Sequence, residues 1–201
     1  MILSELKLWN YYGLANSLYL PLALGASVLL NRDESTSSRL LTLIRQEEPT
    51  LFFADPVAYA AVLGEDERHE LGRLRLCLTS AGALPAPLYE RWRARYSVEL
   101  LHGIGSAEFG YIYISSRPGQ VEPGSCGTVI PPYEARVRGH DGEAVSVGSV
   151  GQLHVRSESV AAGYWGKHEQ TKRTFVGDWL RTGHFVRTDE DGHYFLVETL
   201  A

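Results

Sequence analysis

The chain has 201 residues, of which 44% are hydrophobic and 21% charged, a composition typical of a globular protein with one domain or two small ones. The net charge of −5, with no basic patch along the sequence, argues against a nucleic-acid partner. Two cysteines without zinc or disulfide spacing, and an apolar stretch at 14–30 interrupted by Asn16 and Pro21, argue against a disulfide framework and a membrane span, so a cytoplasmic location is expected.

The first half of the chain alternates predicted helices with short, continuously apolar strands. Apolar residues at helical spacing predict a helix over 8–24, in which Pro21 lies in the first turn of a second segment or at a break. Further helices are predicted at 38–46, 56–63 and 87–96, and strands at 25–30, 50–54, 74–79 and 98–101. Such alternation indicates a mostly parallel sheet with covering helices on both faces.

The pattern changes near residue 117. Short strands at 134–138, 151–156, 179–181 and 194–197 follow, separated by turns rich in glycine and aspartate. They predict an antiparallel unit, either a small barrel or a sandwich. The expected fold class is therefore α/β, with an α/β subdomain at 1–117 and a β-rich, barrel-like subdomain at 118–201.

One segment of interest follows the predicted strand 74–79, and it reads Thr79-Ser80-Ala81-Gly82-Ala83-Leu84-Pro85. Ligands of open α/β sheets bind beyond the carboxyl ends of strands, where small residues let a flat ring or a phosphate approach the backbone. An ordinary strand-to-helix turn has the same composition, so the segment alone leaves both interpretations open.

A second segment follows the strand 98–101, and it reads His102-Gly103-Ile104-Gly105-Ser106-Ala107-Glu108. A glycine-rich loop of this kind can lay its backbone against a ligand and present Glu108 to a metal–phosphate group, since Mg²⁺ prefers carboxylate and phosphate oxygens. The alternative is a glycine turn with Glu108 as a charge in the first turn of a helix.

The third segment is rich in aromatic residues. It combines Gly163-Tyr164-Trp165 with Thr171, Phe175 and the run from Gly177 to Gly183, and is predicted as a loop, a short helix and a hairpin edge. Core packing alone would explain it.

Together, in this order and with these gaps, the three segments resemble the adenylate-forming superfamily, which includes acyl- and aryl-CoA ligases. The Gly-Ile-Gly-Ser form and the segment Tyr12–Asn16 are most similar to benzoate-type CoA ligases. The resemblance covers essentially the whole chain. It implies ATP or AMP, Mg²⁺ and coenzyme A as cofactors, and a small aromatic or acyl carboxylic acid as substrate.

The resemblance also implies roles for individual residues. Glu108 would be the catalytic residue that holds Mg²⁺. The nucleotide site would comprise Ser80, Ala81, Gly82, Ala83, His102, Gly103, Ile104, Gly105, Ser106, Ala107 and His184. The acyl pocket would be bordered by Tyr11, Tyr12, Ala15, Ile104 and Gly105, while Gly163, Tyr164 and Trp165 would be structural.

The sequence also departs from the family pattern. Ala107 replaces the usual threonine, and His184 replaces the aspartate that binds the ribose hydroxyls, although imidazole is not a two-oxygen acceptor. The family's phosphate loop, hinge and C-terminal domain are not recognised in these residues. The expectation is a fragment that is inactive alone and is completed by a chain carrying those parts. The alternatives are a nucleotide- or acyl-binding pseudoenzyme and a non-functional gene remnant.

Overall fold

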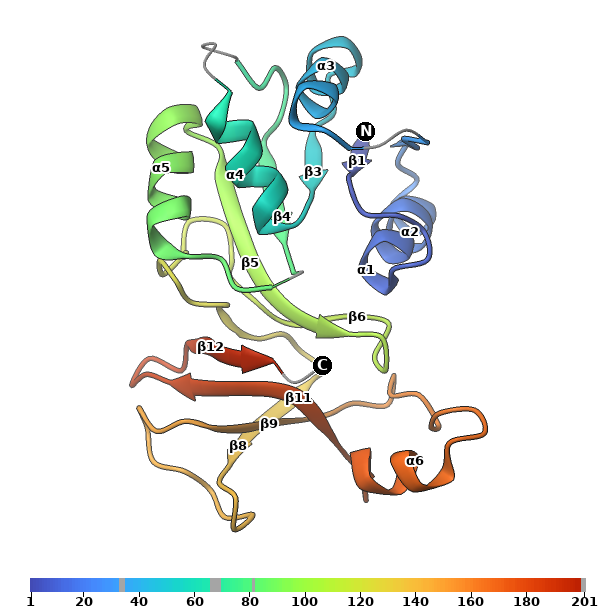
Figure 1. Ribbon diagram of the computed structural model, residues 1–201, viewed down its shortest axis with the longest axis vertical. Coiled ribbons are helices and arrows are strands. Elements are labelled where there is room, and N and C mark those ends of the chain that lie inside the picture. The colour runs from blue at the N-terminus through green and yellow to red at the C-terminus, as the bar shows by residue number, and fades with distance from the viewer. Residues whose placement is uncertain (33–34, 66–69, 81, 200–201) are drawn as a thin grey trace.

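The computed structural model describes residues 1–32, 35–65, 70–80 and 82–199, which form two sheets, one above the other in Figure 1. The first sheet has the strand order β2-β1-β3-β4-β5-β6-β7. Its strands are β1 Ile2–Ser4, β2 Val28–Leu29, β3 Leu51–Phe53, β4 Leu76–Thr79, β5 Glu99–Ser106, β6 Tyr111–Ser115 and β7 Thr128–Val129. Neighbours from β2 to β5 pair in parallel, whereas β6 and β7 are antiparallel. This confirms the mostly parallel sheet.

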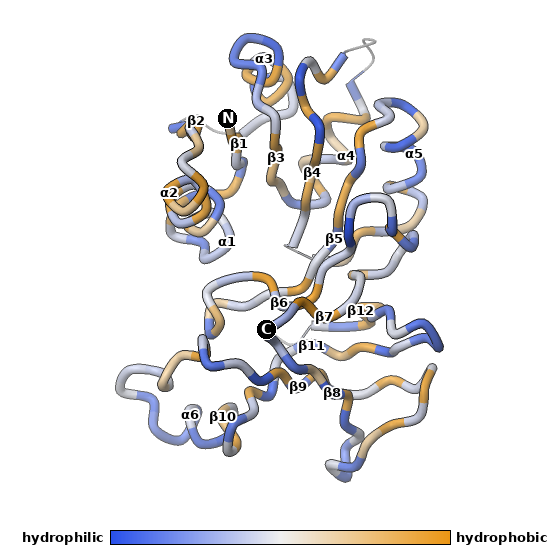
Figure 2. The backbone as a smooth tube through the Cα atoms, turned by 180° about the vertical axis from the view of Figure 1, so that it is seen from behind, coloured by the Kyte–Doolittle hydropathy of each residue, from blue (hydrophilic) through white to orange (hydrophobic). Residues whose placement is uncertain are grey.

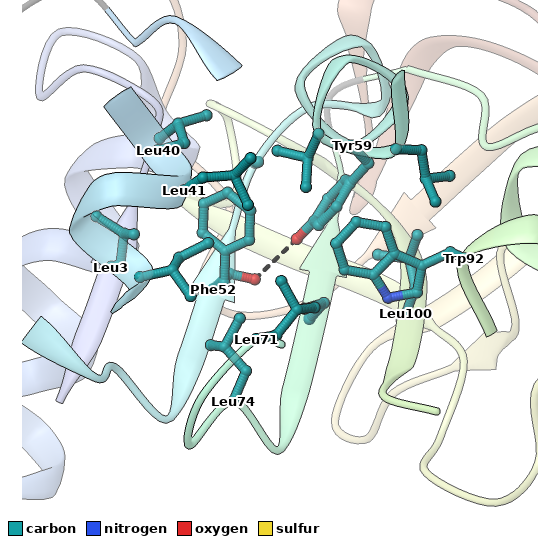
Figure 3. Close-up of a cluster of buried hydrophobic side chains, with 14 of the residues drawn as sticks. Leu3, Leu40, Leu41, Phe52, Tyr59, Leu71, Leu74, Trp92 and Leu100 are labelled. Atoms are coloured by element: carbon teal, nitrogen blue, oxygen red, sulfur yellow. Dashed lines mark hydrogen bonds between the residues drawn. The ribbon is translucent and has the colours of Figure 1, made fainter. Parts of the chain in front are cut away.

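Strand register places one row of apolar side chains on a single face of this sheet. The row runs across β1, β3, β4 and β5 and consists of Leu3, Phe52, Cys77 and Leu100, all fully buried. The helices α3 (Ser37–Glu47), α4 (Pro56–Gly64) and α5 (Ala86–Tyr96) supply the side chains packed against it. In this cluster the Tyr59 hydroxyl donates to the carbonyl oxygen of Phe52 at 2.8 Å, the dashed line in Figure 3.

Two of these helices are capped by a side chain at their first turn, whereas α5 follows Pro85 without a side-chain cap. The side chain of Thr36 accepts from the N–H of Arg39 at the start of α3. The side chain of Asp55 accepts from the N–H of Ala58 at 2.7 Å, and Pro56 occupies the first turn of α4. The helices expected at 38–46, 56–63 and 87–96 are confirmed to within one residue at each end.

The opposite face of the sheet is covered by one helical segment with a π-helical turn in its middle: α1 (Tyr11–Leu14), η1 (Ala15–Tyr19) and α2 (Leu20–Leu24). Pro21 lies in the first turn of α2, not at a break, and Gly25 ends the helix in the left-handed region at φ +60°. The outer side of this segment leaves apolar side chains exposed, namely Leu18, Tyr19, Leu22 and Leu24. Figure 2 shows the hydrophobic colour on α2 as well as along β3, β4 and β5.

The second sheet is antiparallel and curled, as the barrel-like prediction requires. Its strands are β8 Glu134–Arg138, β9 Gly151–Arg156, β10 Phe175–Val176, β11 Trp179–Thr188 and β12 Tyr194–Thr199, with helix α6 at His168–Thr174. The order is β10-β11-β9-β8, with β12 beside β11. Alternate side chains, including Leu153, Val155 and Leu180, point into a core shared with Ile104 and Tyr113 of the first sheet.

The two sheets are also joined by backbone hydrogen bonds. The N–H of Cys126 donates to the carbonyl oxygen of Tyr194 at 2.7 Å, and the N–H of Tyr194 donates to that of Gly127 at 2.9 Å. Strands up to β7 belong to the first sheet, and strands from β8 onward belong to the second. The subdomain boundary near residue 117 stays a prediction. Within the described part of the chain, no helix combines the length and apolar character needed to cross a membrane.

Candidate functional site

The residues of the first two segments meet beyond the carboxyl ends of β4 and β5. Ser80 follows β4 directly, and the turn 107–110 after β5 carries Glu108. Residues at the ends of neighbouring parallel strands share one edge of a sheet, which is the usual ligand position in such folds. Ala81 lies outside the described residues; Gly82 and Ala83 are exposed.

The structure corrects the expected glycine-rich loop at 103–105. These residues belong to β5, which pairs with β6 in a hairpin. A Cβ at Gly103 would lie 2.7 Å from the carbonyl oxygen of Ile114, and one at Gly105 would lie 2.6 Å from that of Tyr111. The glycines are therefore required by strand–strand approach. Glu108 lies in the hairpin turn and not in the first turn of a helix.

Glu108 is held by a partner that the sequence analysis treated as merely structural. The Tyr164 hydroxyl donates to Oε1 of Glu108 at 2.6 Å. Burial alone would raise the pKa of Glu108, but the Tyr164 and Ser106 hydroxyls, its own backbone N–H and nearby His184 together lower it. The carboxylate is therefore ionised at neutral pH. Burial, followed by Glu108, raises the pKa of Tyr164 to about 12, so its hydroxyl remains a donor.

A polar pocket of about 480 Å³ adjoins this carboxylate. Besides Glu108 and Tyr164, the side chains of Gln152, Arg173 and Arg181 line it, from β9, α6 and β11. A carboxylate opposite two guanidinium groups can bind a metal ion and an anionic group side by side.

The His184 side chain contacts other groups of the protein. Its Nδ1 lies 3.1 Å from Oγ1 of Thr199, and its ring also faces the carbonyl oxygen of Gly105 and the carboxylate of Glu108. Burial lowers its pKa, although Gly105 and Glu108 partly offset this. The imidazole is therefore neutral at neutral pH and ties β11 to the hairpin that carries Glu108.

His102 is almost completely buried beneath the Ser80 segment. Its Nε2 lies 2.9 Å from the carbonyl oxygen of Gly82, and its Nδ1 lies 3.2 Å from that of Ser125. Burial lowers its pKa more than these carbonyls raise it. Both ring nitrogens face backbone oxygens, so the ring supports the Gly82 backbone.

Several buried hydroxyl oxygens at this edge have no partner in hydrogen-bond geometry among the described residues. They belong to Thr79, Ser80, Ser106 and Tyr113. Ser106 is nevertheless close enough to Glu108, and Ser80 to Tyr11, to lower the pKa of each, so these hydroxyls form a polar cluster around the Glu108 carboxylate.

The predicted acyl-pocket residues fall into two groups. Tyr11 is partly buried and close to Ser80 and Glu108; its pKa is raised by burial and by Glu108, while Ser80 lowers it. Ala15 lines an apolar cavity of about 240 Å³ with Tyr111 and Tyr19. In contrast, Tyr12 and Ile104 are packed in cores, 1% and 2% exposed.

Sequence reasoning missed Tyr111 and misplaced Trp165. The Tyr111 hydroxyl donates to Oδ1 of Asn16 at 2.7 Å, and its ring stacks on Tyr12. The alternation of tyrosine and isoleucine from Tyr111 would have indicated the strand β6. Trp165 is fully exposed, so core packing is wrong for this residue. Gly163 is structural as expected, because a Cβ there would lie 2.6 Å from the Thr171 side chain.

Comparison with known proteins agrees with this geometry. The family model described as AMP-binding enzyme matches residues 1–165. The chain is 36% identical over 197 residues to a 4-hydroxybenzoate–CoA/benzoate–CoA ligase of Rhodopseudomonas palustris, covering 96% of this chain and 36% of that protein. It is also 36% identical to a benzoate–CoA ligase of Thauera aromatica, covering 96% of this chain and 37% of that protein.

Solved structures show the same relation. A benzoate CoA ligase from Burkholderia xenovorans LB400 superposes with a TM-score of 0.95 at 34% identity, covering 98% of this chain and 41% of that one. An anthranilate CoA ligase in complex with anthranoyl-AMP gives 0.93 at 36% identity, covering 98% and 39%. The chain thus spans 36 to 37% of the length of the two curated ligases above. On this evidence the chain belongs to the family of AMP-binding enzymes.

Proposed function

We propose that the chain forms the adenylate- and acyl-binding part of an AMP-forming ligase that joins a carboxylic acid to coenzyme A. The observation that carries the proposal is the ionised Glu108, held by Tyr164 beside Tyr11 and Ser80 at the ends of β4 and β5. In such a reaction the carboxylate would attack the α-phosphate of ATP and displace pyrophosphate, and the thiol of coenzyme A would then attack the acyl-adenylate and displace AMP. Stabilising the charge that develops at the α-phosphate is the main demand on the protein.

The donor set fits the proposed Mg²⁺ and nucleotide. Glu108 offers a hard, ionised oxygen ligand of the type that Mg²⁺ takes alongside phosphate oxygens. The backbone of Gly82 and Ala83 would flank the adenine, with Ser80 beside it and His102 fixing the Gly82 carbonyl from below. Ser106, whose hydroxyl lies beside Glu108, would supply a hydroxyl at the phosphate side.

An aromatic acid is the substrate that the acyl side favours. Tyr11, Ala15 and Tyr111 present flat or apolar surfaces, and the cavity of about 240 Å³ beside Ala15 and Tyr111 has the size of a small ring. The names of the relatives include benzoate and 4-hydroxybenzoate. Predicted contacts of Tyr12 and Ile104 with the acid would be indirect, because both are buried.

The remaining machinery would come from the rest of a longer protein or from a complementing chain. Support comes from the exposed apolar side of α2, where Leu22 is 75% and Leu24 is 63% exposed. Exposed apolar patches of this kind usually mark interaction surfaces. In the proposal this surface meets the part that carries the phosphate loop, while a C-terminal domain completes catalysis.

Binding without turnover is the second candidate. It is favoured by His184: the family resemblance implies a ribose acceptor at this position, but its imidazole bonds to Thr199 and faces Gly105. Ala107 adds to it, because an exposed methyl group replaces a hydroxyl at the phosphate side.

Isothermal titration of the purified protein with ATP or AMP, with Mg²⁺ present, tests nucleotide binding. We expect micromolar binding that Glu108→Ala weakens roughly 10- to 100-fold, the usual effect of losing a charged ligand contact. Glu90→Ala, on the exposed side of α5, is the matched control and should bind as the wild type does. No binding by a protein shown to be folded would refute both candidates and leave the ligase relation as ancestry alone.

A turnover assay separates the two candidates. The protein would be incubated with ATP, Mg²⁺, benzoate and hydroxylamine, alone and with a chain carrying the missing family segments. Hydroxamate formed only on complementation supports the ligase. Nucleotide binding with no hydroxamate under either condition supports binding without turnover.

A further inference from the structure

A row of basic side chains crosses the outer face of the second sheet. In the register of β8, β9 and β11, Arg136 lies opposite His154, and His154 lies opposite Arg181. Their neighbours Leu153 and Val155 point into the core, so these three side chains share the other face. They come from positions 136, 154 and 181, which explains why no basic patch is visible along the sequence.

None of these three side chains forms an ion pair within the part of the chain that the structure describes, although Arg181 also lines the pocket that contains Glu108. In the next cross-strand pair on this face, the charge of Arg156 is neutralised by Glu134, with which it forms an ion pair of 2.6 Å. In the basic row, by contrast, Nε of Arg136 and Nδ1 of His154 are buried without a hydrogen-bond partner, and His154 is only 8% exposed. The positive charges of Arg136, Arg138 and Arg181 gather around the His154 ring, and such crowding of like charges costs stability unless an anion neutralises it.

The row borders a pocket of about 510 Å³. Arg138, His154 and Arg181 line it together with His140 and Gln152. The guanidinium carbon of Arg136 lies 3.9 Å from the centre of the Trp179 ring, and its charge adds to the positive potential at His154. The nearest acidic hairpin residue, Asp141, directs Oδ1 to the N–H of Glu143 in its own turn.

We propose that this pocket binds a phosphoryl anion, either inorganic phosphate or a phosphate monoester, through Arg138, His154 and Arg181. Guanidinium groups match phosphate oxygens in a forked geometry, and two of them facing a buried imidazole suit a doubly charged group better than a single carboxylate. The pocket shares Arg181 and Gln152 with the pocket beside Glu108 but is not lined by Glu108 itself, and the proposal does not depend on the proposed ligase function.

The basic surroundings of His154 set its protonation state. Burial, with Arg136, Arg181 and Arg138, lowers its pKa to about 4. The ring is therefore neutral at pH 7 and can donate one N–H. An anion beside it favours the protonated form, so bound phosphate raises this pKa.

Calorimetric titration of the purified protein with inorganic phosphate, at constant ionic strength with chloride as the balancing salt, is the primary test. We expect saturable binding that Arg138→Gln weakens roughly 10- to 100-fold, as for loss of a charge-assisted hydrogen bond. Arg91→Gln, an exposed arginine of α5, is the matched control and should leave binding unchanged. Equal responses to phosphate and chloride, or equal binding by Arg138→Gln and the wild type, would overturn the proposal.

A second readout guards against loss of folding. Without phosphate, Arg181→Gln should raise the midpoint of thermal unfolding because it relieves repulsion in the row, while phosphate should no longer raise it further. A merely structural arginine would lower the midpoint instead. Ribose 5-phosphate distinguishes the ligand: binding at least as tight as that of phosphate indicates a monoester site, and its exclusion indicates free phosphate. Glu108→Ala should retain phosphate binding, and loss there would assign the binding to the nucleotide pocket instead.

Discussion

Replacing Tyr164 with phenylalanine tests how Glu108 is held. The change removes a hydroxyl that donates to the ionised Oε1 at 2.6 Å and leaves the ring contact with Phe175 in place. Hydrogen bonds to charged groups contribute about 1.5–3 kcal/mol, and partial exposure of both side chains favours the lower end. We therefore expect Tyr164→Phe to reduce the free energy of unfolding by roughly 1.5 kcal/mol at pH 7.

The effect of Tyr164→Phe on the free energy of unfolding should depend on pH. The pKa of Glu108 is lowered in the folded protein from its ordinary value of 4.5, so the stability that this carboxylate contributes is present above that value. It is lost as the pH falls through the folded-state pKa, and the difference between wild type and Tyr164→Phe should shrink there.

Urea unfolding at pH 7 and at pH 3, for both single variants and the double variant with Glu108→Gln, measures the coupling between the two side chains. Tyr19→Phe, an exposed phenol, serves as the control and should change stability by less than about 0.5 kcal/mol. The reasoning fails if Tyr164→Phe costs the same in the Glu108→Gln background as in the wild type.

Two further predictions concern the joint between the sheets and the basic row. Gly127→Ala should cost more than about 2 kcal/mol in urea unfolding, because φ is +90° and a Cβ would lie 2.0 Å from the N of Ser116. At Gly119, where φ is +75° and the space is open, the same change should cost only about 1 kcal/mol, and equal losses would contradict the steric argument. Because of His154, the free energy of unfolding should fall by up to roughly 3 kcal/mol as the pH falls from about 6.5 to about 4. In this window the imidazole is protonated in the unfolded chain but stays neutral in the folded protein. His154→Gln should flatten this slope in unfolding curves measured across that window, and an unchanged slope would exclude His154 as its source.

The sequence predicted the helices α3, α4 and α5 well because their signals are local, but it cut the two longest strands short: β5 was expected to end at 101 and β11 at 181, whereas they run to Ser106 and Thr188. Apolar periodicity located α3 and α4, and the bounds of β8 and β9 matched those expected. The strands β1, β2, β7 and β10 have only two or three residues each. Two or three residues are too few to show the alternation of apolar and polar side chains that indicates a strand. These strands form because they pair with strands that are distant in the sequence, not because of local preference.

The candidate site was predicted in its composition but not in its connections. The two glycines of the second segment, Gly103 and Gly105, were assigned to ligand approach, whereas hairpin pairing requires them. The bond from Tyr164 to Glu108 spans 56 positions, and no local pattern encodes a contact of that separation. For the same reason the row of Arg136, His154 and Arg181 emerged only once three strands were in register.

Arg181 borders both the proposed phosphate pocket and the pocket beside Glu108. One guanidinium can form a forked pair with only one anion at a time, so the two proposed ligands compete for it. AMP titrated into protein saturated with phosphate should therefore bind more weakly than into phosphate-free protein of equal ionic strength, and AMP should weaken phosphate binding by the same factor, since coupling is reciprocal. In Arg181→Gln the coupling should vanish while AMP still binds. Coupling that survives this change would place the antagonism in the general field of the sheet and not in a shared side chain.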